Sequence, residues 1–484
     1  MLEQLKQVDN IYDLMALCAS YVMNEYNKSE NVYEFATFDD NRFKGVYNAV
    51  VCYTVDCQDQ GRRDAFNELK KFVLSFLEDK LTVERAYAII YYIDELVEVE
   101  LDDGLIEGNH IIKYSALNEQ YQDCIRIIPK RLSTFLSRGD TWYRSTTDSQ
   151  YSMFRDRREF ACSCLDRETN NYSIWDRELI GKYPFTIYRF DEKSSVARHF
   201  RDRDKFNFGL VPFTDKALEQ ILDIQYRERA FFISKMYDEI EEEFRERYND
   251  ICERSSKNDV DFLVFPEMLL TEDIIFSGED QEEGASQIIV NGSISRDQVN
   301  RAVVTDGNKN EIFTYCKKEP FTMKSKGVKY KEWLNPTKNK EYSIIEIEEI
   351  GRVGIAICKD LLSENVRLFH KHVGTDILIV PAYTSSSDLL SAAQNMSTDY
   401  NCIVVVANAC SAVEGDGDLD KELGFVTLPM KTKDKRSSKV IPYFRRDCKR
   451  ICNEQCVGKR IEIDFCSIRR DAEGISYQVS ETSF

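Results

Sequence analysis

The sequence predicts an α/β fold for residues 205–484 and a mainly helical structure for the residues before them. Two patterns indicate this. In residues 1–136, apolar side chains recur every three or four positions, as they do on the buried face of an amphipathic helix. After residue 205, short apolar segments alternate with longer charged ones, which is typical of strands interleaved with helices. The chain has 484 residues, enough for two or three domains with at least one large core.

We divide the chain into a helical domain at 1–136, a mixed or irregular linking region at 137–204, and an α/β domain at 205–484. The linking region sets aromatic residues among many Arg, Asp and Ser without a clear period. In the helical domain, the helices are expected at 2–26, 62–77, 83–101 and within 115–135.

In the α/β domain, a long, charged amphipathic helix is expected at 215–252. The strands are expected where apolar, β-branched and aromatic residues cluster. They are 206–211, 262–265, 288–293, 302–305, 312–317, 343–347, 353–358, 377–380, 403–407 and 460–465.

The composition narrows the possible chemistry. The chain contains 15 Cys without an export signal, so we expect reduced thiols and not a disulfide framework. It contains only 4 His, which argues against a His-rich metal site and against most His-based mechanisms. Catalysis would then fall to Cys, Lys, Asp or Glu side chains.

The charge and hydropathy of the chain limit its partners. The net charge of −19 disfavours general attraction to nucleic acid or to an anionic membrane. No apolar run approaches the roughly 18 residues that a membrane-spanning helix needs, and the first residues lack the pattern of a secretion signal. We therefore expect a soluble, cytoplasmic protein that does not bind membranes.

The first candidate catalytic residue is Glu267, which follows a short apolar strand at 262–265 and Pro266. Because proline cannot continue the hydrogen bonding of a strand, the carboxylate should lie at the strand's carboxyl edge. Apolar surroundings raise the pKa of a carboxylate, which suits a general base. The alternative is an ordinary Glu at the start of a helix, stabilised by the helix dipole.

The second candidate is Lys317, at the end of a predicted β-hairpin. Alternation along the second strand places Phe313, Tyr315 and Lys317 on one face. An inward-facing ammonium costs free energy unless another group compensates it, so this position is unusual. The alternative is a solvated strand end, with Lys318 equally eligible by composition.

The third candidate is Cys358, which a buried strand delivers into a sharp turn where a helix could begin. Backbone N–H groups at the start of a helix can bind a developing oxyanion and lower the pKa of a thiol. The alternative is a buried Cys that acts as a small apolar residue.

The three motifs, in this order, resemble those of the nitrilase, or carbon–nitrogen hydrolase, superfamily. They are Phe-Pro-Glu, Tyr-x-Lys after a hairpin, and Gly-x-x-x-Ile-Cys-x-Asp. Residues 289–293 are similar to the family's strand before the hairpin, and 374–382 and 402–408 to the two strands after the nucleophile. The resemblance covers about residues 205–470.

The resemblance implies a four-layer αββα sandwich with a Glu-Lys-Cys triad. By motif, Glu267 would be the general base, Lys317 the cation beside the tetrahedral intermediate, and Cys358 the nucleophile. The backbone N–H of Lys359 would complete the oxyanion hole. The expected reaction is hydrolysis of a small amide, rather than a nitrile, through a thioester. The resemblance implies neither metal nor organic cofactor, and it implies a homodimer formed through the sandwich.

The sequence also departs from the family's pattern. Glu319 stands where many relatives have His, and residues 361–364 replace a stretch that usually contains Arg. The family's supporting second Glu has two candidates, Glu319 and Glu332. Asp360, in the Cys motif, is a further candidate for a supporting role.

Three cysteines, Cys448, Cys452 and Cys456, have three residues between one and the next, a spacing within the range of zinc ligands. A fourth ligand is missing unless Cys410 or Cys466 folds in. The alternative is that the three thiols share one face of a helix and pack in the core.

The stretch 431–450 is rich in Lys and Arg, with aromatic residues between them. It could contact a phosphate-bearing ligand, an acidic partner or nucleic acid, and a solvated loop is the alternative.

A rival function belongs to a different class. Residues 1–204 would then be an interaction or sensing module that binds a protein partner. The sandwich would be a scaffold or gated effector, similar to nitrilase-like components of bacterial anti-phage defence assemblies. The two hypotheses differ in whether Cys358 is chemically activated.

Overall fold

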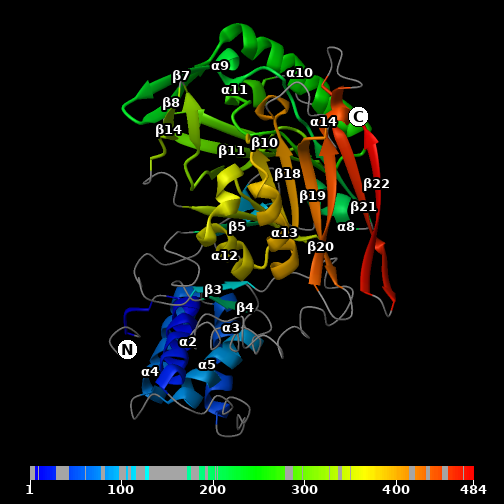
Figure 1. The fold of residues 1–484 in the computed structure, drawn as a ribbon. Coiled ribbons are helices and arrows are strands. Elements are labelled where there is room, and N and C mark those ends of the chain that lie inside the picture. Colours follow the sequence, from blue (N-terminus) through cyan, green and yellow to red (C-terminus); the bar gives the residue numbers. More distant parts are fainter. Residues whose placement is uncertain are drawn as a thin grey trace. The chain divides into compact units, whose positions relative to one another are not determined.

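The architecture comes from a computed structural model of the whole chain (Figure 1). In the N-terminal part it describes residues 6–8, 10–28, 43–59, 62–77 and 82–96, and four short strands between 105 and 175. It then describes 185–484 except for 191–193, 202, 204, 278–286, 297, 326, 336–340, 349, 414–419, 432–435, 450–455 and 472–473.

The chain forms two compact units. The first comprises Met1–Asp103, Ser115–Arg131 and Gly139–Lys182, and the second comprises Gly104–Tyr114, Leu132–Arg138 and Tyr183–Phe484. The boundary differs from the one drawn from sequence, because part of the linking region contributes to the second unit. This part forms β5 (Phe185–Phe190) and α8 (Ser195–Arg201).

The first unit is built mainly from helices whose apolar faces form one core. They are α2 (Ile11–Lys28), α3 (Lys44–Asp59), α4 (Arg62–Leu77) and α5 (Val83–Leu96). Met15, Val46, Leu69 and Ile89 represent the four helices in that core. The apolar period predicts α2, α4 and α5. It does not predict α3, whose Val, Tyr and Thr residues favour strands.

The prediction of a helix within 115–135 is wrong for the residues that the structure describes there. β3 (Arg126–Pro129) instead pairs antiparallel with β4 (Tyr172–Trp175). Adjacent β-branched residues and a proline disfavour a helix at this point. Tyr172 donates its backbone N–H to Asp94 at 2.8 Å, which ties the strand pair to α5.

Two large sheets form the second unit. The nine-stranded sheet contains, in spatial order, β1 (Leu105–Ile106), β2 (Ile111–Ser115), β5, β15 (Tyr342–Ile347), β16 (Gly351–Ile355), β17 (Ile377–Ala382), β18 (Ile403–Asn408), β19 (Glu422–Lys431) and β20 (Arg436–Phe444). The seven-stranded sheet contains β12 (Glu311–Cys316), β11 (Val299–Asp306), β10 (Ile288–Arg296), β9 (Phe262–Val264), β6 (Lys205–Leu210), β21 (Lys459–Asp471) and β22 (Gly474–Ser483). The strand segments expected from sequence in the α/β domain all fall on strands of these two sheets.

The two sheets pack face to face between helical layers (Figure 1). On the nine-stranded sheet lie α12 (Glu364–Val373) and α13 (Asp388–Tyr400), with Phe369 of α12 stacked on Tyr342 at 4.0 Å. On the seven-stranded sheet lies α10 (Asp238–Lys257), whose Tyr248 shares a core with Phe265. The expected αββα sandwich is therefore confirmed.

The prediction of a single long helix at 215–252 is wrong. The segment forms α9 (Leu218–Ile221), then a hairpin of β7 (Leu222–Arg227) and β8 (Ala230–Met236), and only then α10. The chain turns at Glu228, whose φ of 53° is left-handed and incompatible with a continuous helix. Alternation of apolar and polar residues in the hairpin overrides its high content of charged helix formers.

The hairpin belongs to a third, small sheet, in the order β13 (Thr322–Ser325), β14 (Val328–Glu332), β8 and β7. Short helices complete the unit: α11 (Glu272–Ile275), η4 (Cys410–Ala412) and α14 (Arg445–Lys449). Among the described residues, no helix is both long and apolar enough to cross a membrane.

Gly292 is required where β10 passes the segment that leads to Glu267. A Cβ at this position would lie 1.5 Å from the Pro266 carbonyl oxygen. We expect Gly292→Ala to lower the free energy of unfolding by roughly 3 kcal/mol or more, because backbone and not a flexible side chain must move. Hydrogen exchange of β9 and β10 peptides would measure the loss. Gly45→Ala, where the new Cβ has only an ordinary 3.4 Å contact with Phe72, is the control. Unchanged exchange in Gly292→Ala would contradict the expectation.

His370 makes the stability of α12 depend on pH. Burial lowers the pKa of this side chain from 6.5 to about 3, although Nδ1 lies 2.9 Å from Thr375 Oγ1. As the pH falls below 6.5, the histidine becomes protonated in the unfolded state but stays neutral in the folded state, so the free energy of unfolding decreases. The free energy of unfolding of the wild type, relative to that of His370→Gln, should therefore fall by about 1.4 kcal/mol per pH unit below pH 6. Urea titrations from pH 7 to 5, followed by exchange of α12 peptides, test this. A difference that is constant with pH would refute it.

Candidate active site

The three candidate catalytic residues meet where strands of both large sheets end. Glu267 follows β9, Lys317 directly follows β12, and Cys358 follows β16 after two further residues. Glu267 and Lys317 are fully buried, and Cys358 is 3% exposed. The two sheets are joined at this point by the backbone N–H of Glu267, which donates to the Ala382 carbonyl at the end of β17 at 3.3 Å.

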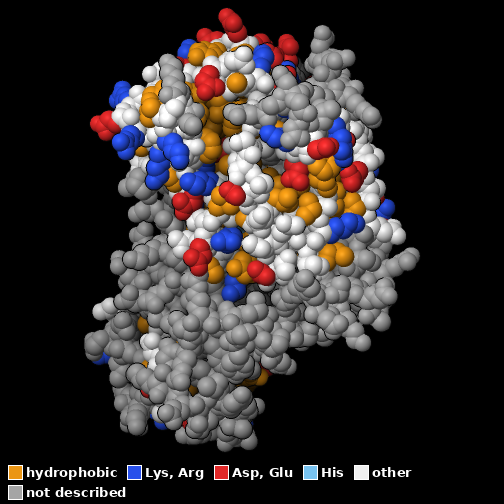
Figure 2. All heavy atoms as spheres, viewed as in Figure 1, with side chains coloured by type: hydrophobic (Ala, Val, Ile, Leu, Met, Phe, Trp, Pro, Cys, Tyr) orange, Lys and Arg blue, Asp and Glu red, His pale blue; other side chains and the backbone are white. Residues whose placement is uncertain are grey.

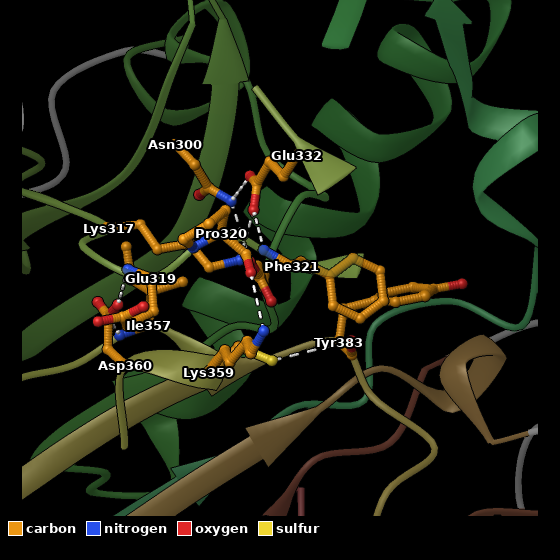
Figure 3. A network of polar contacts seen from close by, with 12 residues as sticks. Asn300, Lys317, Glu319, Pro320, Phe321, Glu332, Ile357, Lys359, Asp360 and Tyr383 are labelled. Carbon is orange, nitrogen blue, oxygen red and sulfur yellow. Dashed lines mark hydrogen bonds and ion pairs between the residues drawn. The ribbon is translucent and has the colours of Figure 1, made fainter. Parts of the chain in front are cut away.

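Lys317 is held between two carboxylates. Its Nζ donates to Glu267 Oε1 at 2.5 Å and to Glu332 Oε2 at 2.8 Å (Figure 3). Burial alone would lower the pKa of Lys317, but the two carboxylates raise it above its ordinary value, so the ammonium stays charged. Two of its three N–H donors are occupied in these ion pairs, which leaves one for a ligand.

Of the two candidates for a supporting Glu, only Glu332 contacts Lys317. It reaches the site from the end of β14 and also accepts the backbone N–H of Phe321 at 2.9 Å. Glu319 instead accepts a hydrogen bond from Ser363 Oγ at 2.9 Å. Lys318 donates to the Glu341 carbonyl, and burial lowers its pKa to about 8.

Asn300 is a member of the site that sequence reasoning missed. Its Nδ2 donates to Glu267 Oε1 at 2.9 Å and to Glu332 Oε1 at 2.6 Å (Figure 3). Ionised carboxylates only accept hydrogen bonds, so the amide nitrogen must face them. The register of β11 and β12 pairs Arg301 with Cys316, which sets Asn300 opposite Lys317. This hairpin register is the signal that could have found it.

The two oxygens of Glu267 differ in their surroundings. Oε1 accepts from both Lys317 and Asn300, whereas Oε2 is buried without a hydrogen-bond partner of standard geometry among the described residues. Burial raises the pKa of Glu267 above its ordinary value, against the opposing effect of Lys317. The carboxylate is thus a stronger base than one in water, and its proton-accepting site is Oε2.

Cys358 lies in a strained turn. Its φ of 47° is left-handed, which is uncommon for a non-glycine residue and is often found at functional sites. The residue begins the short 3₁₀ helix η3 (Cys358–Leu362), and Sγ lies 3.9 Å from the Tyr383 carbonyl oxygen (Figure 3). Burial and the neighbouring Glu267 raise the pKa of the thiol well above its usual value, so it needs a base to become nucleophilic.

The side chain of Lys359 is fixed by a hydrogen bond from its Nζ to the Pro320 carbonyl oxygen at 3.2 Å. Its backbone N–H belongs to the first turn of η3, where helical N–H groups have no partner inside the helix. The group therefore has no partner within η3, and it belongs to the residue that directly follows Cys358.

Asp360 connects the segment that carries Lys317 to the turn that carries Cys358. Its carboxylate accepts the backbone N–H groups of Lys318 and Glu319, at 2.9 and 2.7 Å, and that of Ile357 at 3.2 Å. The hydroxyl of Tyr315 also donates to it, at 3.0 Å. Burial raises the pKa of Asp360 to about 6. The carboxylate thus fixes the segment that carries Lys317 against the turn that carries Cys358.

The other predicted sites lie elsewhere. Cys448 and Cys456 are buried and both interact with Tyr443, while Cys452 lies outside the described residues. Among the described residues, no group of three or more His, Cys, Asp or Glu is arranged to hold a metal ion. The zinc site therefore stays a prediction.

The described cations of the stretch 431–450 differ in their surroundings. Arg445 is buried and donates to the Val413 carbonyl at 3.0 Å. Arg446 pairs with Asp420 at 2.5 Å and lies over the Phe444 ring. Lys439 is exposed on β20.

Asn300 should be intolerant of a change that reverses its hydrogen bonding. We expect Asn300→Asp to lower the free energy of unfolding by about 2–4 kcal/mol, because it sets a third carboxylate against two buried ones. Asn249→Asp is a matched control, since the Asn249 side chain accepts a hydrogen bond from Lys309 Nζ at 2.9 Å and the change would strengthen that contact. Exchange rates of β12 peptides, or thermal unfolding, would compare the two. Equal stability of the two variants would contradict this account.

Comparison with known proteins finds similarity in structure only. No family profile and no curated protein sequence matches the chain. One similar solved structure is Nit3 of Saccharomyces cerevisiae, a member of branch 10 of the nitrilase superfamily, at 13% identity and a TM-score of 0.31, covering 52% of this chain and 96% of that one. An amidase from Nesterenkonia sp. has 13% identity and a TM-score of 0.27, covering 50% of this chain and 90% of that one. The glutamine-dependent NAD+ synthetase of Acinetobacter baumannii has 14% identity and a TM-score of 0.30, covering 57% of this chain and 48% of that one.

Values this low say nothing about the activity of the chain. The sandwich and the placing of Glu267, Lys317 and Cys358 at its strand ends are observed in the chain itself. The second unit is thus an αββα sandwich that holds these three residues where its strands end.

Proposed function

We propose that the second unit hydrolyses a non-peptide carbon–nitrogen bond, that of an amide rather than a nitrile, through a thioester on Cys358. One observation carries the proposal: a buried thiol beside a carboxylate whose Oε2 has no hydrogen-bond partner of standard geometry among the described residues, with an ammonium fixed on the other oxygen. Base, cation and nucleophile thereby lie together in a buried site, where their electrostatic effects are largest.

The first step is attack on the carbonyl carbon. The proton of Cys358 Sγ passes to Glu267 Oε2 while the sulfur–carbon bond forms. The negative charge that develops on the substrate oxygen is stabilised by the third N–H of Lys317 and by the backbone N–H of Lys359.

The second step releases the amine and then the acid. Glu267 gives its proton to the departing nitrogen as the carbon–nitrogen bond breaks, which leaves a thioester. Glu267 then takes a proton from a water molecule that attacks the thioester, and the returning thiolate recovers that proton. The products are an amine, or ammonia, and a carboxylic acid.

Glu332 keeps the charges balanced during these steps. When Glu267 is protonated, Lys317 retains a counter-ion in Glu332 at 2.8 Å. Without it, protonation of the base would leave the ammonium buried without a carboxylate, at a cost of several kcal/mol. We assign Glu332 and Asn300 to the positioning of the base and the cation.

Several further features stay predictions. They are the cytoplasmic location, the homodimer through the sandwich, and a protein partner for residues 1–204. The rival function, a scaffold or gated effector of a defence assembly, predicts an inert Cys358, so one experiment separates it from the hydrolase.

The experiment is quantitative labelling with chloroacetamide, a small amide that alkylates thiols, followed by peptide mass spectrometry. We expect Cys358 to be labelled in the wild type, and Glu267→Gln to slow its labelling and any amide turnover by about 10²- to 10⁴-fold, the usual effect of removing a general base. Glu267→Gln should fold, because Lys317 and Glu332 remain as a balanced pair.

Cys52, which is exposed in the first unit, is an internal control that should label equally in both proteins. Cys402, which is buried on the same sheet as Cys358, should resist labelling in both. Labelling of Cys52 without Cys358, or an unchanged Cys358 rate in Glu267→Gln, would reject the hydrolase in favour of the scaffold.

A further inference from the structure

The small sheet of the second unit has one face turned to the protein and one turned to solvent. On the inner face, Phe231 and Glu332 are buried. Their neighbours Phe232 and Lys331 must point outward, since side chains alternate along a strand. We define the basic aromatic face as this outer surface with the adjoining turn: Arg227, Arg229, Phe232, Lys329, Lys331 and Trp333.

The strand register brings cations together on this face. Lys331 of β14 is the pairing partner of Ala230 in β8, and Ala230 is that of Arg227 in β7. Lys331 and Arg227 therefore lie in one row, about 10 Å apart at two strand spacings, with only a methyl group between them. Lys329 lies two residues further along β14, on the same side.

The four cations of this face have no salt-bridge partner among the described residues, and all four are exposed. On α10, by contrast, cations pair with carboxylates of the same helix; examples are Arg247, Arg254 and Lys257. Figure 2 shows Lys and Arg side chains gathered at the upper left, over β7, β8 and β14. Although the exposed Glu228 lies between Arg227 and Arg229, the cations outnumber it four to one, so this face attracts anions in a chain with a net charge of −19.

The face also exposes aromatic rings. Trp333 is 40% exposed, and its ring lies 6.1 Å from that of Phe232, at 77°. The Arg227 guanidinium lies over the Phe232 ring at 5.5 Å. Exposed rings beside unpaired cations provide surfaces on which bases can stack while phosphates meet the charges.

We propose that the basic aromatic face binds single-stranded nucleic acid, with the four cations on phosphates and Trp333 against a base. An acidic polypeptide would satisfy the cations but leave the exposed rings without a matching group. Of the stretch 431–450, Arg445 is buried on the Val413 carbonyl and Arg446 is paired with Asp420, so we place the contact on this face and not there. The proposal is independent of the hydrolase activity.

The test is fluorescence anisotropy of the full chain with fluorescein-labelled 20-nucleotide oligo(U) and oligo(dT). At 50 mM salt we expect a dissociation constant of about 1–100 μM for at least one probe. Arg227→Gln/Lys329→Gln/Lys331→Gln should weaken binding at least tenfold and reduce the slope of log K against log salt by about 2. Trp333→Ala should weaken binding roughly 5- to 100-fold, with loss of the quenching of tryptophan fluorescence by the oligonucleotide.

The matched control is Lys216→Gln/Arg245→Gln/Lys257→Gln, which removes the same charge from cations that are paired with carboxylates. It should bind like the wild type. Absence of wild-type binding to both probes, or equal loss in the two triple variants, would overturn the proposal. Binding of poly-L-glutamate as tight as that of the oligonucleotides, with Trp333→Ala unaffected, would overturn it in favour of an acidic protein partner.

Discussion

The arrangement of the second unit follows from one buried ammonium. A lysine without exposure to water is tolerated only when counter-charges and hydrogen bonds surround it. Lys317 obtains them from Glu267 and Glu332, which arrive from different sheets. The ends of β9, β12 and β14 must therefore converge on one point, and Asn300 must hold the two carboxylates apart from each other and against the lysine.

The same burial that makes this cluster costly prepares its chemistry. Removal from water increases the proton affinity of Glu267 and of the Cys358 thiol together. A resting thiol with its proton in place does not react with solutes that cannot enter, and the base that can remove the proton lies beside it. In the proposed mechanism, burial thus both keeps the thiol protonated at rest and supplies the base that removes its proton.

Features carried by local sequence could be predicted, and features that depend on distant residues could not. Pro266 ends a strand just before Glu267, and alternation points Lys317 inward, so both positions are readable within a few residues. The choice of Glu332 over Glu319 depends on the small sheet, whose β7–β8 hairpin is hidden in a segment that has the charge and spacing of a helix. Asn300 escaped notice because an Asn has no distinctive chemistry until its two carboxylate partners are known.

Strand β14 contributes to two surfaces: the buried cluster around Lys317 needs a carboxylate from it, and the basic aromatic face needs cations. Lys331 points to solvent and Glu332 to the buried Lys317, because neighbouring residues of a strand face opposite ways. Loss or gain of one residue within the strand would send the lysine inward and the glutamate outward, creating two buried cations where one is balanced. We therefore expect this hairpin to tolerate insertions and deletions only in the turn at Gly327, and its outer face to be altered by substitution alone.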